Sequence, residues 1–126
     1  MKKLIAAFLL ILAPAVYADD CSSATMGTVP FAFETITVST AVKILTVATY
    51  VPVDGPRATA AFISVAAYDS RVRFDGVAPT ASVGHLMTAG TFFTVCENTL
   101  TRLTMIRDTG AGGDSLVTVT YMRPLQ

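Results

Sequence analysis

The sequence predicts an all-β protein, an antiparallel β-sandwich that is jelly-roll-like or immunoglobulin-like. Short segments rich in Val, Ile, Thr and aromatic residues recur along the 126-residue chain, and clusters of Gly, Pro, Asp and Asn separate them. After residue 18, no stretch of sequence has the length and periodicity of an amphipathic helix. A chain of this length is expected to form one domain with a single modest core.

The N-terminus has the layout of a secretory signal peptide. Lys2 and Lys3 precede the apolar run Leu4–Val16, which leads into Ala18. As a helix this run is about 20 Å long, too short for a hydrocarbon core of about 30 Å, so no stable transmembrane span is expected. We expect a signal-peptide-like segment over residues 1–18, an irregular lead-in over 19–30 and a single β-sandwich domain over 31–126.

The first strand is expected over Phe31–Ser39. Its apolar residues, including Phe31 and Phe33, alternate but change phase at Glu34-Thr35, which predicts a β-bulge or a bend there. A second strand is expected over residues 42–47. A short edge strand is expected over residues 50–53, because Pro52 cannot donate a ladder hydrogen bond.

The middle of the chain is expected to supply three strands. Ala58–Tyr68 has apolar residues in both phases, which predicts a strand buried on both faces. Arg71–Asp75 alternates apolar and charged residues, as a half-buried strand does. An ordered turn containing Pro79 and Gly84 follows, and Thr91–Val95 resumes as a strand.

The C-terminal third is expected to begin with a turn at Glu97-Asn98. Thr99–Asp108 fits both helical spacing and strand alternation, and its three threonines favour the strand. Thr109–Asp114 predicts a glycine-rich hairpin loop. Ser115–Met122 is the clearest strand, because its apolar residues alternate without interruption.

The charge balance argues against nucleic acid as a partner. Without residues 1–18 the chain has seven basic and nine acidic side chains, a formal net charge of 7 − 9 = −2. Binding to phosphates needs a clustered basic surface, which this composition does not favour.

Cys21 and Cys96 are the two cysteines of the chain, and both lie beyond Ala18, after which cleavage of the signal-like segment is expected. In an exported protein such a pair predicts a disulfide bond. The bond would close a loop of about 75 residues, for which the chain-entropy argument gives at most roughly 4 kcal/mol of stabilisation.

The sequence predicts no catalytic, cofactor-binding or metal-binding residue. His85 is the sole histidine and has no neighbouring nucleophile, so we expect a hydrogen-bonded turn residue. The loop Gly110–Gly113 lacks the lysine and the helix that follow a phosphate-binding loop. The aspartates do not have the spacing of a calcium-binding loop, and two cysteines with one distant histidine are too few ligands for zinc.

Four arginines are the candidate partner-contact residues: Arg71, Arg73, Arg102 and Arg107. On a strand, Arg71 and Arg73 share one face with Asp75 and form an outward row. Such a row is either a solvated face with weak salt bridges or a docking surface for an acidic or carbonyl-rich partner, to which the planar guanidinium group is suited.

Two segments resemble small structural proteins of tailed bacteriophages. One is the run VRFDGVAPTASVGH from Val72 to His85, followed by Gly90; the other runs from Leu103 to Gly110 and closes in Leu116–Tyr121. The resemblance covers roughly residues 58–122 and implies a small β-sandwich that decorates or joins parts of a virion without catalytic residues. The signal-like N-terminus and the cysteine pair depart from this pattern, because tailed-phage virions assemble in the reducing cytoplasm.

Two functions are therefore carried forward. The first is a non-enzymatic virion protein, a capsid decoration or head–tail accessory subunit. Its partners would be major capsid or head–tail proteins, contacted by many copies or by a homo-oligomer whose individual contacts can be weak. The alternative is an exported, periplasmic or extracellular domain that binds a glycan or an envelope protein through exposed aromatic rings, with Tyr50, Tyr68, Phe92 and Phe93 as candidates.

Overall fold

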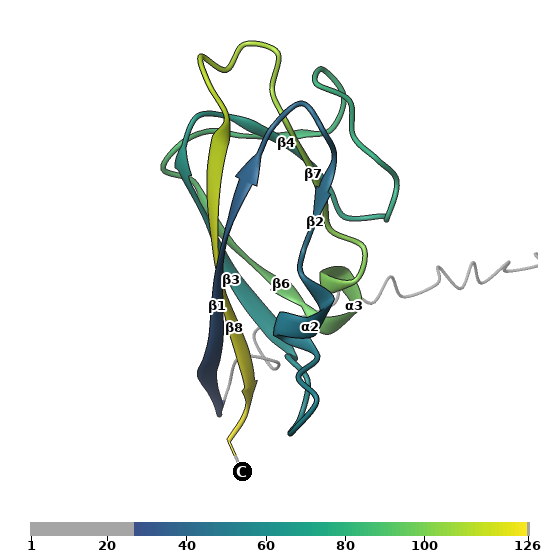
Figure 1. The fold of residues 1–126 in the computed structure, drawn as a ribbon, viewed down its shortest axis with the longest axis vertical. Helices are drawn as coiled ribbons and strands as arrows, with labels where there is room; N and C mark the ends of the chain where they lie inside the picture. The colour runs from purple at the N-terminus through teal and green to yellow at the C-terminus, as the bar shows by residue number, and fades with distance from the viewer. Residues whose placement is uncertain (1–26, 126) are drawn as a thin grey trace, which may run out of the picture.

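Two four-stranded antiparallel sheets pack face to face in the structure, a computed structural model that describes residues 27–125 (Figure 1). Sheet A has the strand order β1-β8-β3-β6 and sheet B the order β2-β7-β4-β5. The expected all-β, antiparallel architecture is confirmed. The signal-like segment over residues 1–18 and residues 19–26 of the lead-in lie outside the described residues.

Sheet A contains the longer strands: β1 (Thr28–Val38), β8 (Ser115–Pro124), β3 (Ala60–Ala67) and β6 (Phe92–Cys96). Sheet B contains β2 (Lys43–Ile44), β7 (Thr104–Arg107), β4 (Ser70–Arg73) and β5 (His85–Met87). Two single-turn helices, α2 (Val47–Tyr50) and α3 (Glu97–Leu100), lie towards one end of the sandwich (Figure 1). None of the helices within residues 27–125 is long and apolar enough to cross a membrane.

The core lies between the sheets. The inward phases of β3 and β8 are fully buried, as the alternation of Ser115–Met122 predicts. From sheet B, Val72 of β4 and Met105 of β7 face them, which confirms the predicted alternation around Val72. The inward residues of β3 and β8 are Ala61, Ile63, Val65, Val117, Val119 and Tyr121.

β1 begins three residues earlier than expected, and its bulge lies elsewhere. The register against β8 shifts between Pro30 and Ala32 and is continuous at Glu34-Thr35, so of the predicted bulge or bend at Glu34-Thr35 the bulge is wrong. Because a bulge inserts one extra residue, it separates two rings that simple alternation places in the same phase. Phe31 packs against the core, whereas Phe33 is 62% exposed.

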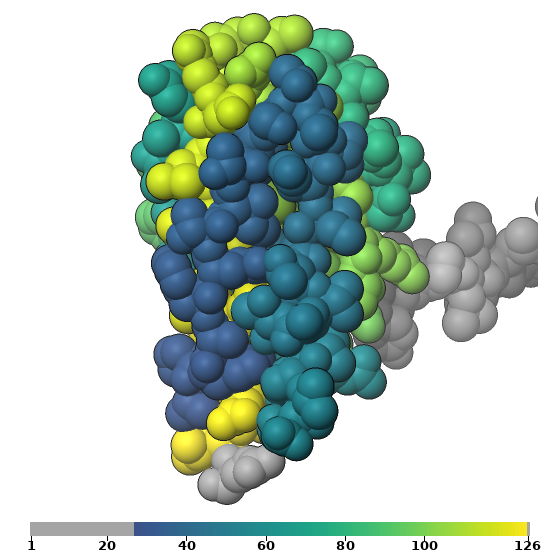
Figure 2. All heavy atoms as spheres, in the orientation of Figure 1, coloured from purple at the N-terminus to yellow at the C-terminus, as the bar shows by residue number. Residues whose placement is uncertain are grey.

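The edge strand predicted over residues 50–53 is also wrong. Val47–Tyr50 forms one helical turn, and the preceding strand is reduced to Lys43–Ile44. The turn buries Tyr50, whose ring centroid lies 5.8 Å from that of Tyr121. Burial of this large ring outweighs the β-propensity of the segment. In Figure 2 the side chains of β1 and of the α2 segment pack together, and Thr46 N–H donates to Glu34 Oε1 at 3.1 Å.

Three further expectations need correction. Phe62 is 40% exposed, so β3 is buried on one face and not on both. Thr99 and Leu100 belong to α3, so the helical spacing was informative there, and β7 starts only at Thr104. The glycine-rich loop 109–114 connects sheet B to sheet A and is therefore not a hairpin loop.

Candidate partner-binding surface

Part of the outer face of sheet B is covered by the chain itself, whereas Ile44 of β2 and Leu86 of β5, which lie in the outward phase, stay exposed. The connection between β4 and β5, residues 74–84, folds over the middle of this face and is fixed by hydrogen bonds to Thr104, which starts β7, and to Thr109, just after the end of β7. The Thr104 hydroxyl donates to the Val77 carbonyl at 2.8 Å, and Thr109 N–H donates to the Ala81 carbonyl at 3.0 Å. Thr104 and Ile106 are buried although they lie in the outward phase of β7.

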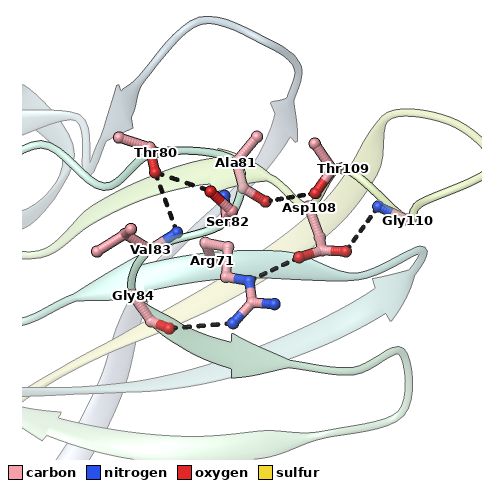
Figure 3. A network of polar contacts seen from close by, with 9 residues as sticks. All are labelled: Arg71, Thr80, Ala81, Ser82, Val83, Gly84, Asp108, Thr109 and Gly110. Atoms are coloured by element: carbon pink, nitrogen blue, oxygen red, sulfur yellow. Dashed lines mark hydrogen bonds and ion pairs between the residues drawn. The ribbon is translucent and has the colours of Figure 1, made fainter.

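An ion pair between Arg71 and Asp108 helps to fix residues 74–84, which we call the covering loop, on sheet B (Figure 3). Arg71 Nε donates to Asp108 Oδ1 at 2.6 Å, and Arg71 Nη1 donates to the Gly84 carbonyl at 3.2 Å. Gly110 N–H donates to Asp108 Oδ2 at 2.8 Å. The hydrogen bond from Arg71, and after it the one from Gly110, lowers the pKa of Asp108 below its ordinary value. One ion pair thus joins β4, the covering loop and the start of the β7–β8 connection.

Two more of the candidate arginines are paired within the chain. Arg73 binds Asp75 through two hydrogen bonds and lowers the pKa of Asp75 to about 2, with help from the backbone N–H of Val77. Arg107 Nη1 lies 2.9 Å from Asp114 Oδ1.

Arg102 is exposed and has no ion pair with any residue between 27 and 125. The sequence-predicted row of arginines therefore does not form one free basic surface. A direct contact between these arginines and a partner stays a prediction, and Arg102 is the side chain best placed for it.

The outer face of sheet A has a different character. Its outward positions come from all four strands, and none of them carries a charge. Cross-strand register aligns Phe33, Thr120, Phe62 and Thr94 in one row and Thr35, Thr118, Ser64 and Phe92 in the next. We call this surface the uncharged face. Its residues are Phe33, Thr35, Thr37, Phe62, Ser64, Phe92, Thr94, Leu116, Thr118, Thr120 and Met122.

Three phenylalanine rings stand out from the uncharged face. Phe33 is 62% and Phe92 67% exposed, so no described segment covers them as residues 74–84 cover sheet B. The ring centroids of Phe62 and Phe92 lie 5.7 Å apart, which makes a continuous apolar patch across β3 and β6. Beside Phe33, the bulge leaves a shallow hollow of about 300 Å³ lined by Pro30, Phe31, Ala32, Phe33 and Thr120. The face thus combines protruding rings with a depression that can receive one.

The aromatic residues proposed from sequence lie in different places. Tyr50 is buried, and Phe93 packs against the core with its ring 5.9 Å from that of Phe74. Tyr68 is exposed but lies over the glycine-rich loop, where its ring approaches Gly113. Phe92 alone among them lies on the uncharged face. Phe33 and Phe62 were missed because only the register between distant strands shows that they share a surface with Phe92.

The remaining candidate residues lie apart from this patch. His85 is exposed at the start of β5 and not in a turn, with its ring 5.5 Å from that of Phe74. Cys96 ends β6 in the same outward phase as Phe92 and Thr94 and is 8% exposed. Cys21 lies outside the described residues, so the Cys21–Cys96 bond stays a prediction; it would fasten the preceding chain at this end of sheet A.

Two features of the described chain bear on small ligands. A hollow of about 180 Å³ beside α2 and α3 is partly closed by an ion pair between Arg57 Nε and Glu97 Oε1 at 2.8 Å. Within residues 27–125, no group of three or more His, Cys, Asp or Glu side chains is placed to hold a metal ion.

Comparisons of the chain with known protein families, with curated proteins and with solved structures find no match.

Proposed function

We propose that the protein is a non-enzymatic structural subunit of a bacteriophage virion, a capsid decoration or head–tail accessory protein that binds neighbouring subunits. The observation that carries this proposal is the uncharged face, which exposes Phe33, Phe62 and Phe92 on a rigid four-stranded sheet. The resemblance of residues 58–122 to small phage structural proteins supplies the class of particle.

The chemistry of the face suits a protein contact. The centres of protein interfaces are enriched in aromatic residues and depleted of charge, as this face is. A sheet holds its side chains in fixed positions, so little conformational entropy is lost when a partner covers them. On a symmetric shell, many weak contacts of this kind add up to firm attachment.

The order of the strands supports the jelly-roll-like alternative over the immunoglobulin-like one. Successive strands mostly alternate between the two sheets, and the first strand, β1, pairs with the last strand, β8, in sheet A. Jelly rolls occur in viral capsid domains and also in lectins, so this topology is compatible with both functions carried forward. The choice between them depends on the site and not on the fold.

The alternative, an exported domain that binds a glycan or an envelope protein, has one observation in its favour. On the uncharged face, phenylalanine rings alternate with threonine hydroxyls along Phe33, Thr120, Phe62 and Thr94. Sugar rings present apolar faces and hydroxyl groups, so a surface of this composition suits them as well.

Mass spectrometry of particles banded from the native culture tests the proposal. We expect full-length protein in the particle band. Protein that starts at Asp19 and occurs only in periplasm or medium would overturn the proposal and support the exported domain.

A further inference from the structure

We propose that the neighbour covering the uncharged face is a second copy of this chain, packed sheet A against sheet A. This inference rests on the proposed function in one respect, that the face is a contact surface. It adds the identity of the partner and the symmetry of the contact.

The absence of charge favours a partner face that is also uncharged. A charged partner surface would lose its hydration against Phe33, Phe62 and Phe92 without gaining an opposite charge, which is costly. The outer face of sheet B is less suitable, because residues 74–84 cover its middle and because Arg71 and Arg73, which lie in its outward phase, carry charge. Within residues 27–125, sheet A of another copy is the extended uncharged surface available.

Size argues for a contact that is specific but weak. The four strands have 11, 10, 8 and 5 residues; at about 4.8 Å between strands and about 3.3 Å per residue they give a flat patch of roughly 500 Å². Side-chain relief raises the accessible area, so two copies together would bury on the order of 1,000 Å², the lower limit for a specific interface. We therefore expect a weak, reversible dimer, which forms at the high local concentration of a lattice and not in dilute solution.

The positions of the rings and of the hollow select one symmetry. Phe92 lies on β6 at one edge of sheet A, and the hollow beside Phe33 lies on β1 at the other edge. A two-fold axis parallel to the strands places β6 of each copy over β1 of the other. Because a two-fold contact is self-complementary, the β6 edge then meets the β1 edge twice. This axis keeps each residue's position along the strands, so Phe92 lies over the row of Thr35, one row from Phe33. An axis across the strands would instead place β1 on β1 and leave both hollows facing each other.

Sedimentation velocity of the purified protein over a dilution series, with its N-terminus defined by mass spectrometry, tests the inference. Phe92→Asp and Phe33→Asp each place one carboxylate per copy in the contact. Both side chains are more than half exposed, so the fold should survive, which thermal unfolding checks. Val53→Asp, at a fully exposed position in the connection between α2 and β3, adds the same charge outside sheet A and is the matched control.

We expect the wild type to dimerise reversibly and both phenylalanine variants to weaken association by roughly a hundredfold or more, since each dimer buries two unpaired charges. Val53→Asp should associate like the wild type. Amide resonances of Thr118 and Thr120 in β8 should shift on dilution, whereas those of Arg71 and Val72 in sheet B should not. A wild type that remains monomeric at 1 mM, or a dimer unaffected by Phe92→Asp and Phe33→Asp, overturns the inference.

The failure of this inference is distinguishable from failure of the proposed function. A protein that bands with particles but does not self-associate remains a virion subunit whose face another virion protein covers; loss of banding on Phe92→Asp would then locate that contact. A protein that dimerises through sheet A but is absent from particles satisfies this inference and refutes the virion proposal.

Discussion

Removal of one hydroxyl group, by Tyr121→Phe, should measurably destabilise the fold. Tyr121 is fully buried, and its hydroxyl donates a hydrogen bond to Glu34 Oε1, which also accepts the backbone N–H of Thr46. A hydrogen bond to a charged acceptor contributes about 1.5–3 kcal/mol. Glu34 is only half-buried and keeps Thr46, so water can partly replace the lost donor, and the lower value, about 1.5 kcal/mol, applies. For a domain of this size, this loss lowers the Tm by roughly 5–10 °C.

Thermal and urea unfolding of Tyr121→Phe, Glu34→Gln and the double variant would isolate this hydrogen bond. The coupling free energy between the two substitutions should be on the order of 1 kcal/mol, because the side chains are in direct contact. Tyr68→Phe removes a hydroxyl from a ring that is 49% exposed and should change stability by less than about 0.5 kcal/mol. Additive effects of Tyr121→Phe and Glu34→Gln, or a Tm within 2 °C of the wild type for Tyr121→Phe, would refute the reasoning.

Three other expectations concern pH and the covering loop. Burial, and then the hydrogen bond to Glu34, raises the pKa of Tyr121. The contribution of Tyr121 to the free energy of unfolding is therefore complete below about pH 10 and is lost as the pH rises further. In urea titrations, Tyr121→Phe should lose less stability than the wild type when the pH is raised above about 10. The pKa of Asp108 is lowered, so the contribution of this carboxylate to the free energy of unfolding is present above about pH 4 and is lost on acidification. Between pH 5 and pH 2.5, the Tm of Asp108→Asn should therefore fall less than that of the wild type. Gly84→Ala should destabilise the fold by about 1 kcal/mol more than Gly90→Ala. Both glycines have positive φ, but only at Gly84 would an added Cβ lie 3.1 Å from a backbone oxygen, that of Val72. Equal Tm values for the two variants would contradict this reasoning.

The alternation of apolar residues was enough to predict the two-sheet fold. It placed β4, β6 and β8 within two residues of their ends, because period-2 burial is a local property of each strand. It failed where one residue changes the phase, as at Phe31, and where a short segment bends to bury a ring, as at Tyr50. Both events depend on what the opposite sheet offers, which a local pattern does not contain.

The candidate site was harder to predict for the same reason. Alternation correctly puts Arg71 and Arg73 in the outward phase, but it cannot show that the register of β4 with β7 brings Asp108 within reach of Arg71. Phe62 lies in a run of small apolar residues and reads as core. Its exposure follows from the pairing of β3 between β8 and β6, strands that are about 30 or more residues away in the chain. The sequence predicts which residues of a strand lie on the same face, and only the sheet topology shows which of the two faces stays exposed to solvent.

The asymmetry between the two outer faces connects stability with function. Sheet B consists of strands of two to four residues, and it obtains further burial from the loop that Arg71 and Asp108 fasten over it. Sheet A has long strands and pairs β1 with β8 over ten residues of register, so it does not need a cover to hold together. Leaving Phe33, Phe62 and Phe92 exposed is unfavourable for a monomer, because each ring keeps apolar area in contact with water. Residues 74–84 cover part of the outer face of sheet B, whereas the aromatic outer face of sheet A stays exposed, and this difference is the physical basis for the proposal that another molecule covers sheet A.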